Sequence, residues 1–208
     1  MSETTDLLKK IIRTEPIQQR SSARITLLLD AAAEIISDTG IEGLTTSDVA
    51  LRSKSSVGVV YRYFPNIRSL LRALAARNME RYMVTLEQAI PSDAAQWADG
   101  IDNAIDTYVS MMRTEPGFRA IRFGDVIDER LLEPDVDSGG MLSQLFMSLL
   151  TERYGFTRSD ELMFRLEVAV EVADGLIKRA FQLDPGGDER FIERTRDLVR
   201  AELALVNP

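Results

Sequence analysis

Residues 53–64, with the sequence SKSSVGVVYRYF, concentrate side chains whose chemistry suits contact with a phosphate backbone. Serine and tyrosine hydroxyls donate hydrogen bonds to phosphate oxygens, and lysine and arginine add positive charge. The small residues that open the stretch let the main chain approach a bound surface, and a valine there can meet the methyl group of thymine. The stretch therefore indicates DNA binding rather than catalysis.

The composition excludes most catalytic and metal sites. The 208 residues include no cysteine and no histidine, which rules out disulfides, Cys/His zinc sites and nucleophiles paired with histidine. Neither a GxGxxG nor a GxxxxGK[ST] phosphate-binding loop occurs. We expect no enzymatic activity, metal or cofactor. A helical-bundle enzyme that works with carboxylates stays open, but it needs several acidic side chains around one cavity.

The elements that present this stretch are predicted to be helices, because apolar residues recur at helical spacing. One helix is predicted over residues 22–39, and a short one opens with a capping box formed by Thr45 and Asp48. Ser56 caps a third helix, which Pro65 ends, and Asn66 can cap the long helix that follows. Two short helices joined by a turn are typical of a helix-turn-helix, whose second helix enters the major groove. The expected DNA contacts are Thr45, Thr46, Lys54, Ser55, Ser56, Val57, Gly58, Tyr61, Arg62, Tyr63 and Arg68.

Charge is distributed unevenly along the chain. The net charge is −8, yet residues 20–81 carry nine basic and six acidic side chains. Residues 82–208 carry 13 basic and 24 acidic ones. A mildly basic first part and a strongly acidic second part indicate two surfaces with different partners.

Residues 22–75 resemble the N-terminal domain of the tetracycline-repressor (TetR) family. The resemblance rests on Ala32-Ala33, Gly40, Thr45-Thr46-x-x-Val49-Ala50, Ser56, Gly58, Tyr61-x-Tyr63-Phe64-Pro65 and Leu70-Leu71. It implies an all-helical, homodimeric transcriptional repressor that binds a palindromic operator in double-stranded DNA. It also implies a divergent C-terminal domain that binds a small effector. A DNA-binding activator or architectural regulator without an effector is the alternative.

Three positions depart from the pattern of the family. The turn, usually Ala-Gly-Val-Ser, here reads SKSS, so that Lys54 stands where a glycine often adopts a positive φ. If that backbone is kept, the lysine costs about 1 kcal/mol. Ser55 replaces a small apolar residue between the two helices. Ile67 stands where the family tends to place a lysine that reaches phosphate, and Arg68 follows it.

The expected domains are an N-terminal extension over residues 1–20, a helix-turn-helix domain over residues 21–66 and a ligand-binding and dimerisation domain over residues 67–208. Further helices are predicted over residues 67–90, 93–113, 125–132, 141–154 and 188–206, with a short one after Thr114. Another, over about residues 160–183, has either Ser159 or Thr157 as its cap. The helix over residues 160–183 is apolar on more than one face, so one face is free to meet a second copy in a four-helix bundle. The expected dimer interface consists of Leu166, Val170, Ala173, Ile177, Phe191, Thr195, Leu198 and Val199.

Methionine and aromatic side chains in the same half suit either an ordinary core or an adaptable apolar pocket for a small effector. The pocket candidates are Trp97, Tyr108, Met111, Phe118, Phe123, Met141, Phe146 and Met147. The acidic side chains interspersed among them are expected to lie on solvated faces.

Residues 1–19 suit either a flexible tail or a short helix that touches DNA or a partner. They lack the apolar core and cleavage site of a secretory signal. The chain contains no apolar run near the roughly 18–20 residues of a membrane span. We expect a cytoplasmic protein without a membrane partner.

Overall fold

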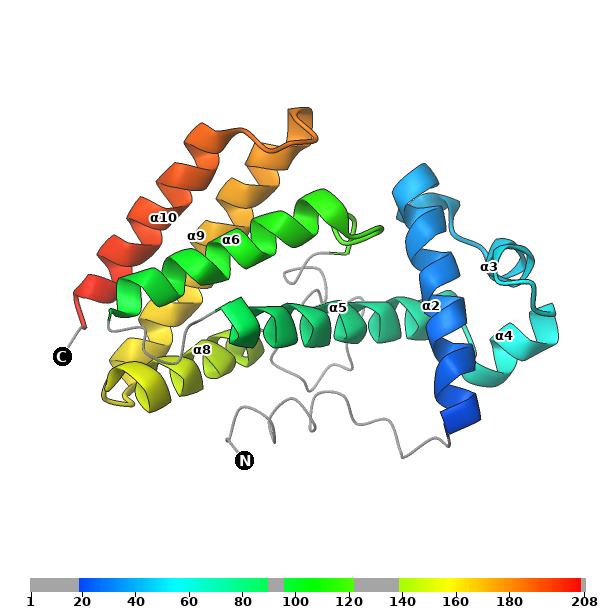
Figure 1. Cartoon of the computed structure of the whole chain (residues 1–208), viewed down its shortest axis with the longest axis horizontal. Coiled ribbons are helices and arrows are strands. Elements are labelled where there is room, and N and C mark those ends of the chain that lie inside the picture. Colours follow the sequence, from blue (N-terminus) through cyan, green and yellow to red (C-terminus); the bar gives the residue numbers. More distant parts are fainter. Residues whose placement is uncertain (1–18, 90–95, 122–138, 207–208) are drawn as a thin grey trace. The chain divides into compact units, whose positions relative to one another are not determined.

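A computed structural model describes residues 19–89, 96–121 and 139–206, and all regular secondary structure in these residues is helical (Figure 1). The predicted all-α fold is confirmed over this part of the chain. Residues 1–18, the predicted helix over residues 125–132 and the start predicted at residue 93 lie outside the described residues.

The chain divides into two compact units. Among the described residues, the front unit contains residues 19–80 and 115–121, and the bundle unit contains residues 81–89, 96–114 and 139–206. Helix α5 (Ile67–Ala89) contributes to both. We expected the first boundary at residue 66, but Leu70 and Leu74 are buried in the core of the front unit. The front unit therefore runs on to Glu80.

The front unit is built on α2 (Gln19–Thr39), η1 (Ile41–Gly43), α3 (Thr46–Arg52) and α4 (Val57–Tyr63). The apolar stripe predicted for α2 is buried, and it packs against residues from α3, α4 and the first half of α5. The two short helices, drawn in cyan in Figure 1, form the predicted helix-turn-helix. This core fixes α4 against α2, because the same buried side chains cover both.

The predicted helix caps are present. The backbone N–H of Asp48 donates to Thr45 Oγ1 at 3.1 Å, and that of Val59 donates to Ser56 Oγ at 3.3 Å. At the start of α5, the Ser69 N–H donates to Asn66 Oδ1 at 2.8 Å. Each cap satisfies a backbone donor that the first turn of a helix leaves without a partner. The boundaries of these helices are therefore encoded locally.

The segment that follows α6 belongs to the front unit. Residues 115–121 form hydrogen-bonded turns in place of the short helix predicted after Thr114. Gly117 has a φ of 72°, and a Cβ there would lie 2.9 Å from the carbonyl oxygen of Ala33 in α2. Ile121 is buried in the same core as the helix-turn-helix. Only glycine allows this close approach of the segment to α2.

The bundle unit contains α6 (Trp97–Thr114), α8 (Gly139–Tyr154), α9 (Asp160–Leu183) and α10 (Glu189–Ala204). Helices α9 and α10 pack side by side, and α8 packs against α9 (Figure 1). Ser159 caps α9 and Asp188 caps α10 through their side-chain oxygens. The hydroxyl of Tyr82 in α5 donates to the Ala104 carbonyl of α6 at 3.1 Å.

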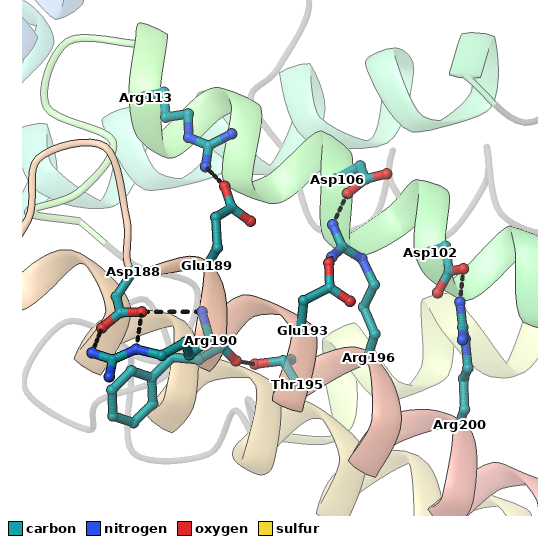
Figure 2. A network of polar contacts seen from close by, with 11 residues as sticks. Asp102, Asp106, Arg113, Asp188, Glu189, Arg190, Glu193, Thr195, Arg196 and Arg200 are labelled. Atoms are coloured by element: carbon teal, nitrogen blue, oxygen red, sulfur yellow. Dashed lines mark hydrogen bonds and ion pairs between the residues drawn. The ribbon is translucent and has the colours of Figure 1, made fainter.

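Helices α6 and α10 run antiparallel and are joined by a row of ion pairs (Figure 2). Asp102 pairs with Arg200, and Asp106 pairs with Arg196. At the other end, the Arg113 guanidinium pairs with Glu189 at 2.6 Å. Partly exposed pairs of this kind contribute only about 0–1 kcal/mol each. They set the register of the two helices more than they add stability.

None of the helices in the described part of the chain is long and apolar enough to cross a membrane.

Candidate nucleic-acid interface

The turn between α3 and α4 keeps a backbone shape that favours glycine. Lys54 has a φ of 52°, which an L-residue rarely adopts. Its N–H donates to the Leu51 carbonyl at 3.2 Å, and the Ser55 N–H donates to the Ala50 carbonyl at 2.8 Å. The departure from glycine at residue 54 has therefore changed the side chain without changing the turn. It also places an exposed amine on the turn.

Helix α4 turns one side to solvent. Val60 is buried in the core of the front unit, and Phe64, which follows the helix, is buried with it. On the opposite side the exposed residues are Val57, Gly58, Tyr61 and Arg62. A Cβ added at Gly58 would meet only the Ser56 Oγ, at 3.9 Å, so nothing in the chain itself requires a glycine there.

The two tyrosines of α4 have different surroundings. Tyr61 is 51% exposed, and its hydroxyl accepts a hydrogen bond from Thr46 Oγ1 at 3.3 Å. This bond ties α4 to α3 and leaves the Tyr61 proton available to an acceptor outside the chain. Tyr63 is half-buried and packs against the core of the front unit. Tyr61 is thus the tyrosine that lies open to a partner.

Two predicted contacts already serve as caps. The Thr45 hydroxyl accepts from the Asp48 N–H and lies 2.5 Å from an Asp48 carboxylate oxygen, to which it donates its proton. The Ser56 hydroxyl accepts from the Val59 N–H. Ser56 keeps its proton for an outside acceptor, whereas Thr45 uses its proton within the chain.

Positive charge on this surface is partly uncompensated. Arg52 pairs with Asp38 at 3.1 Å and with Glu34 at 3.3 Å, which fastens α3 to α2. The hydrogen bonds to Asp38 and then Glu34 raise the pKa of Arg52. The predicted contacts Lys54, Arg62 and Arg68 are exposed, and within the described residues no carboxylate pairs with any of them.

Sequence reasoning missed one residue of this surface. Arg24, on α2, donates from Nη1 to the Ser55 Oγ at 3.3 Å. Ser55 is half-buried, and its own hydroxyl donates to the Ser53 carbonyl at 3.4 Å. The two residues are 31 positions apart, so no local pattern joins them. The only sequence signal was an arginine on the polar side of the predicted first helix.

The residues expected to line an effector pocket do not all lie in the same unit of the chain. Tyr108, Met111 and Met147 are buried in the bundle unit. Trp97 and Phe146 are half-buried there, and the Trp97 ring meets the Phe156 ring edge-on, with centroids 5.8 Å apart.

The remaining pocket candidates lie elsewhere. Phe118 is buried but belongs to the front unit, not to the bundle unit. Phe123 lies outside the described residues, and so does the side chain of Met141.

The acidic side chains gather in no metal-binding group among the described residues. Asp102 and Asp106 are engaged in the ion pairs with α10. Burial raises the pKa of the Tyr154 phenol, whose hydroxyl lies against the helix backbone at Gly100.

Half of the expected dimer residues are covered by their own chain. Leu166 and Thr195 are 2% and 0% exposed, and Ile177 and Val199 are also buried. These side chains fill the contact between helices of the bundle unit, so they have no surface to offer a partner. The half-buried members are Val170, Ala173, Phe191 and Leu198.

A further strip of apolar residues on α9 and α10 is partly open: two of its members are exposed and four are half-buried. Phe164 is 56% exposed, and Val168 and Val172 follow it at four-residue spacing on the same side of α9. On α10, Phe191 and Leu198 share a side at seven-residue spacing, and Leu205, the residue that caps the C-terminal end of the helix, continues the same spacing. The strip is therefore defined by Phe164, Val168, Val172, Phe191, Leu198 and Leu205.

Both halves of the chain match known protein families. Residues 28–74 match the family described as bacterial regulatory proteins, tetR family. Residues 95–206 match the C-terminal domain of tetracyclin repressor-like proteins. A TetR-family transcriptional regulator from Streptomyces coelicolor has the same fold, with a TM-score of 0.74 and 38% sequence identity. That similarity covers 88% of this chain and 99% of the other.

Two curated repressors are more distant relatives. The tetracycline repressor proteins of class D from Escherichia coli and class H from Photobacterium damsela subsp. piscicida are each 29% identical to this chain over 104 residues. These matches cover 50% of this chain and 46% of each repressor, so the chain spans about half the length of the curated relatives that it matches.

Proposed function

This chain belongs to the TetR family of bacterial regulatory proteins, and from that premise we propose that it is a transcriptional repressor. It binds a palindromic operator in double-stranded DNA as a homodimer, and a small effector molecule releases it. It needs no cofactor and catalyses no reaction. It acts in the cytoplasm, where its operator lies.

The observation that carries the DNA-binding role is the open side of α4. Val57 and Gly58 offer a small surface to the base edges of the major groove. The phenol of Tyr61 and the charge of Arg62 lie on the same side and suit contacts to phosphate. Lys54 and Arg68 add positive charge beside the helix without an acidic partner among the described residues.

The homodimer is supported by the partly open apolar strip of α9 and α10. A helix pair that leaves Phe164 and Leu205 exposed, and Phe191 and Leu198 half-buried, gains free energy when these side chains are covered. A second copy of the same strip forms a four-helix bundle across a two-fold axis. Two copies of α4 about 34 Å apart then read the two halves of a palindrome.

Effector binding can change DNA affinity because consecutive segments of the chain belong to different units. Helix α6 lies in the bundle unit, and residues 115–121, which directly follow it, are packed in the front unit against α2. Helix α5 is also shared. Suppose that α6 can take two placements and that the effector binds the protein more tightly in one of them. The effector then favours that placement, and residues 115–121 move with α6 and shift α2 and the recognition helix.

The first test is selection of duplexes from a random-sequence pool by the purified full chain, followed by fluorescence anisotropy on a selected duplex and its scrambled counterpart. We expect a palindromic consensus and a steep negative slope of log affinity against log salt concentration, because several phosphates are neutralised. Equal, weak binding to both duplexes would overturn the DNA-binding role.

The second test separates a repressor with an effector from a regulator without one. A library of small molecules is screened for compounds that release the selected duplex. A compound that lowers DNA affinity and raises the unfolding temperature of the free protein supports the effector role. If nothing in a chemically diverse library releases the duplex, the alternative of an activator or architectural regulator is favoured.

A further inference from the structure

We propose that Arg24 on α2 is a DNA-backbone contact and that Ser55 positions it, an inference that rests on the proposed DNA-binding function. The observation is the hydrogen bond from Arg24 Nη1 to Ser55 Oγ, which joins the start of the first helix to the turn of the helix-turn-helix. Both residues lie in the front unit. The bond holds the guanidinium next to the turn from which α4 begins.

The bond has little value for stability. Arg24 is exposed, and a single hydrogen bond between exposed groups gains little over the bonds that water offers. Two other arginines that link helices of the front unit are compensated: Arg52 by two carboxylates and Arg77 by Asp30 at 2.6 Å. Within the described residues no carboxylate pairs with Arg24. Its charge is therefore free to serve an outside anion.

The place of the bond fits a phosphate of the duplex. Ser55 lies between Lys54, an exposed amine, and Ser56, the cap of α4. A guanidinium has five N–H donors, and Ser55 takes one of them. The others remain for phosphate oxygens, which a guanidinium binds with two parallel bonds. A contact from α2 would fix the orientation of the front unit while α4 reads the bases.

This arrangement gives Ser55 a different role from the DNA contact expected from sequence. Its proton is directed at the Ser53 carbonyl, and its oxygen accepts from Arg24. The serine that replaces the small apolar residue of the family is then a positioning residue, which orders the arginine before DNA arrives. Ordering a flexible side chain in advance removes part of the entropy cost of binding.

The test of Arg24 is the salt dependence of binding by the full-length Arg24→Gln variant to the selected duplex. Each phosphate-binding charge that is removed should reduce the steepness of the slope of log affinity against log salt concentration by about 0.9. A dimer loses one such charge from each protomer, so the steepness of its slope should fall by about 1.8 in total. The decrease in affinity is expected to be equal on selected and scrambled duplexes, because phosphates carry no sequence information. Arg24→Lys keeps the charge and should keep the slope.

Arg153→Gln is the matched control, since Arg153 is an exposed arginine on α8 of the bundle unit and lies outside both the front unit and the strip of α9 and α10. It should leave the slope unchanged. A slope for Arg24→Gln equal to that of the wild type would overturn the proposal while the repressor function stands. A wild-type chain that binds no duplex would overturn both.

Ser55→Ala tests the positioning role. It should weaken binding without changing the salt slope, because the charge of Arg24 remains, and Ser55→Thr should restore the affinity. In the Arg24→Gln background, Ser55→Ala should cause no further decrease in affinity. Additive decreases would show that Ser55 acts on DNA directly and would overturn its positioning role. Thermal unfolding of each variant separates these effects from a failure to fold.

Discussion

Lys54 has a backbone conformation that favours glycine, yet it carries a long side chain. The left-handed φ of 52° costs a residue with a Cβ about 1–2 kcal/mol relative to its ordinary conformations. The hydrogen bonds of the turn hold the backbone there. As a result, an exposed amine lies in the turn before α4.

We expect Lys54→Gly to stabilise the free protein by about 0.5–1 kcal/mol, because relief of the strain exceeds the greater chain entropy that glycine has when unfolded. Urea unfolding at neutral pH measures this change. Lys54→Ala removes the same amine but keeps a Cβ, so it should give no such gain. Equal stabilities for the two variants would contradict the account of strain.

Gly58 is expected to show opposite effects on stability and on binding. Gly58→Ala should stabilise the free protein by about 0.5–1 kcal/mol, since the position is helical and a Cβ there would make only an ordinary contact with Ser56 Oγ, at 3.9 Å. The same methyl group would stand between α4 and the base edges, so affinity for the selected duplex should fall. Unfolding curves measure the expected gain in stability, and fluorescence anisotropy on the same protein preparation measures the expected loss of DNA affinity. A variant that is more stable and binds equally well would remove Gly58 from the interface.

At the scale of the element, the start of α10 depends on one carboxylate. Asp188 accepts hydrogen bonds from the backbone N–H of Arg190 at 3.0 Å and from its guanidinium at 2.5 Å (Figure 2). The side-chain bond from Arg190, more than the backbone bond, lowers the pKa of Asp188 below its ordinary value of 3.8. The cap thus works in its ionised form.

The stability contributed by this ionised form is fully present above the unfolded-state pKa of Asp188 and is lost as pH falls through the lower folded-state pKa. We therefore expect wild type and Asp188→Asn to differ in unfolding free energy by a constant amount above about pH 5, and by less as pH drops below about 4. Parallel urea titrations across this range test it. A difference that grows toward acid pH would contradict the lowered pKa.

At the scale of the whole molecule, the proposed homodimer has the strip of α9 and α10 as its interface. Phe164→Glu should raise the dimer Kd about 30-fold or more, because an unpaired charge left in an interface costs about 2–5 kcal/mol. Sedimentation equilibrium measures this. Val84→Glu is the matched control, since Val84 on α5 is 48% exposed and lies outside the strip. Equal dimerisation of Phe164→Glu and wild type would place the interface elsewhere.

The features of the fold that depend on residues close together in the sequence could be predicted. The caps at Thr45, Ser56 and Asn66 were predicted correctly because a cap involves residues only three positions apart. The division after Glu80 differs from the boundary expected at residue 66, because burial of Leu70 depends on a core that residues from three other helices complete.

In the candidate site, too, the local features could be predicted and the contacts between distant segments could not. The open side of α4 could be inferred because helical phase separates Val60 from Tyr61. The link between Arg24 and Ser55 could not be inferred, since it exists only once two distant segments have packed together.

The amino-acid sequence by itself determined an all-helical chain with a helix-turn-helix near its start, because helical periodicity and capping act within about one turn. Only the tertiary structure decided which apolar stripe of α9 is filled by its own chain, since two stripes of the same period look alike until neighbours cover one. It also decided that residues 115–121 join the front unit, because only folding brings Gly117 against Ala33.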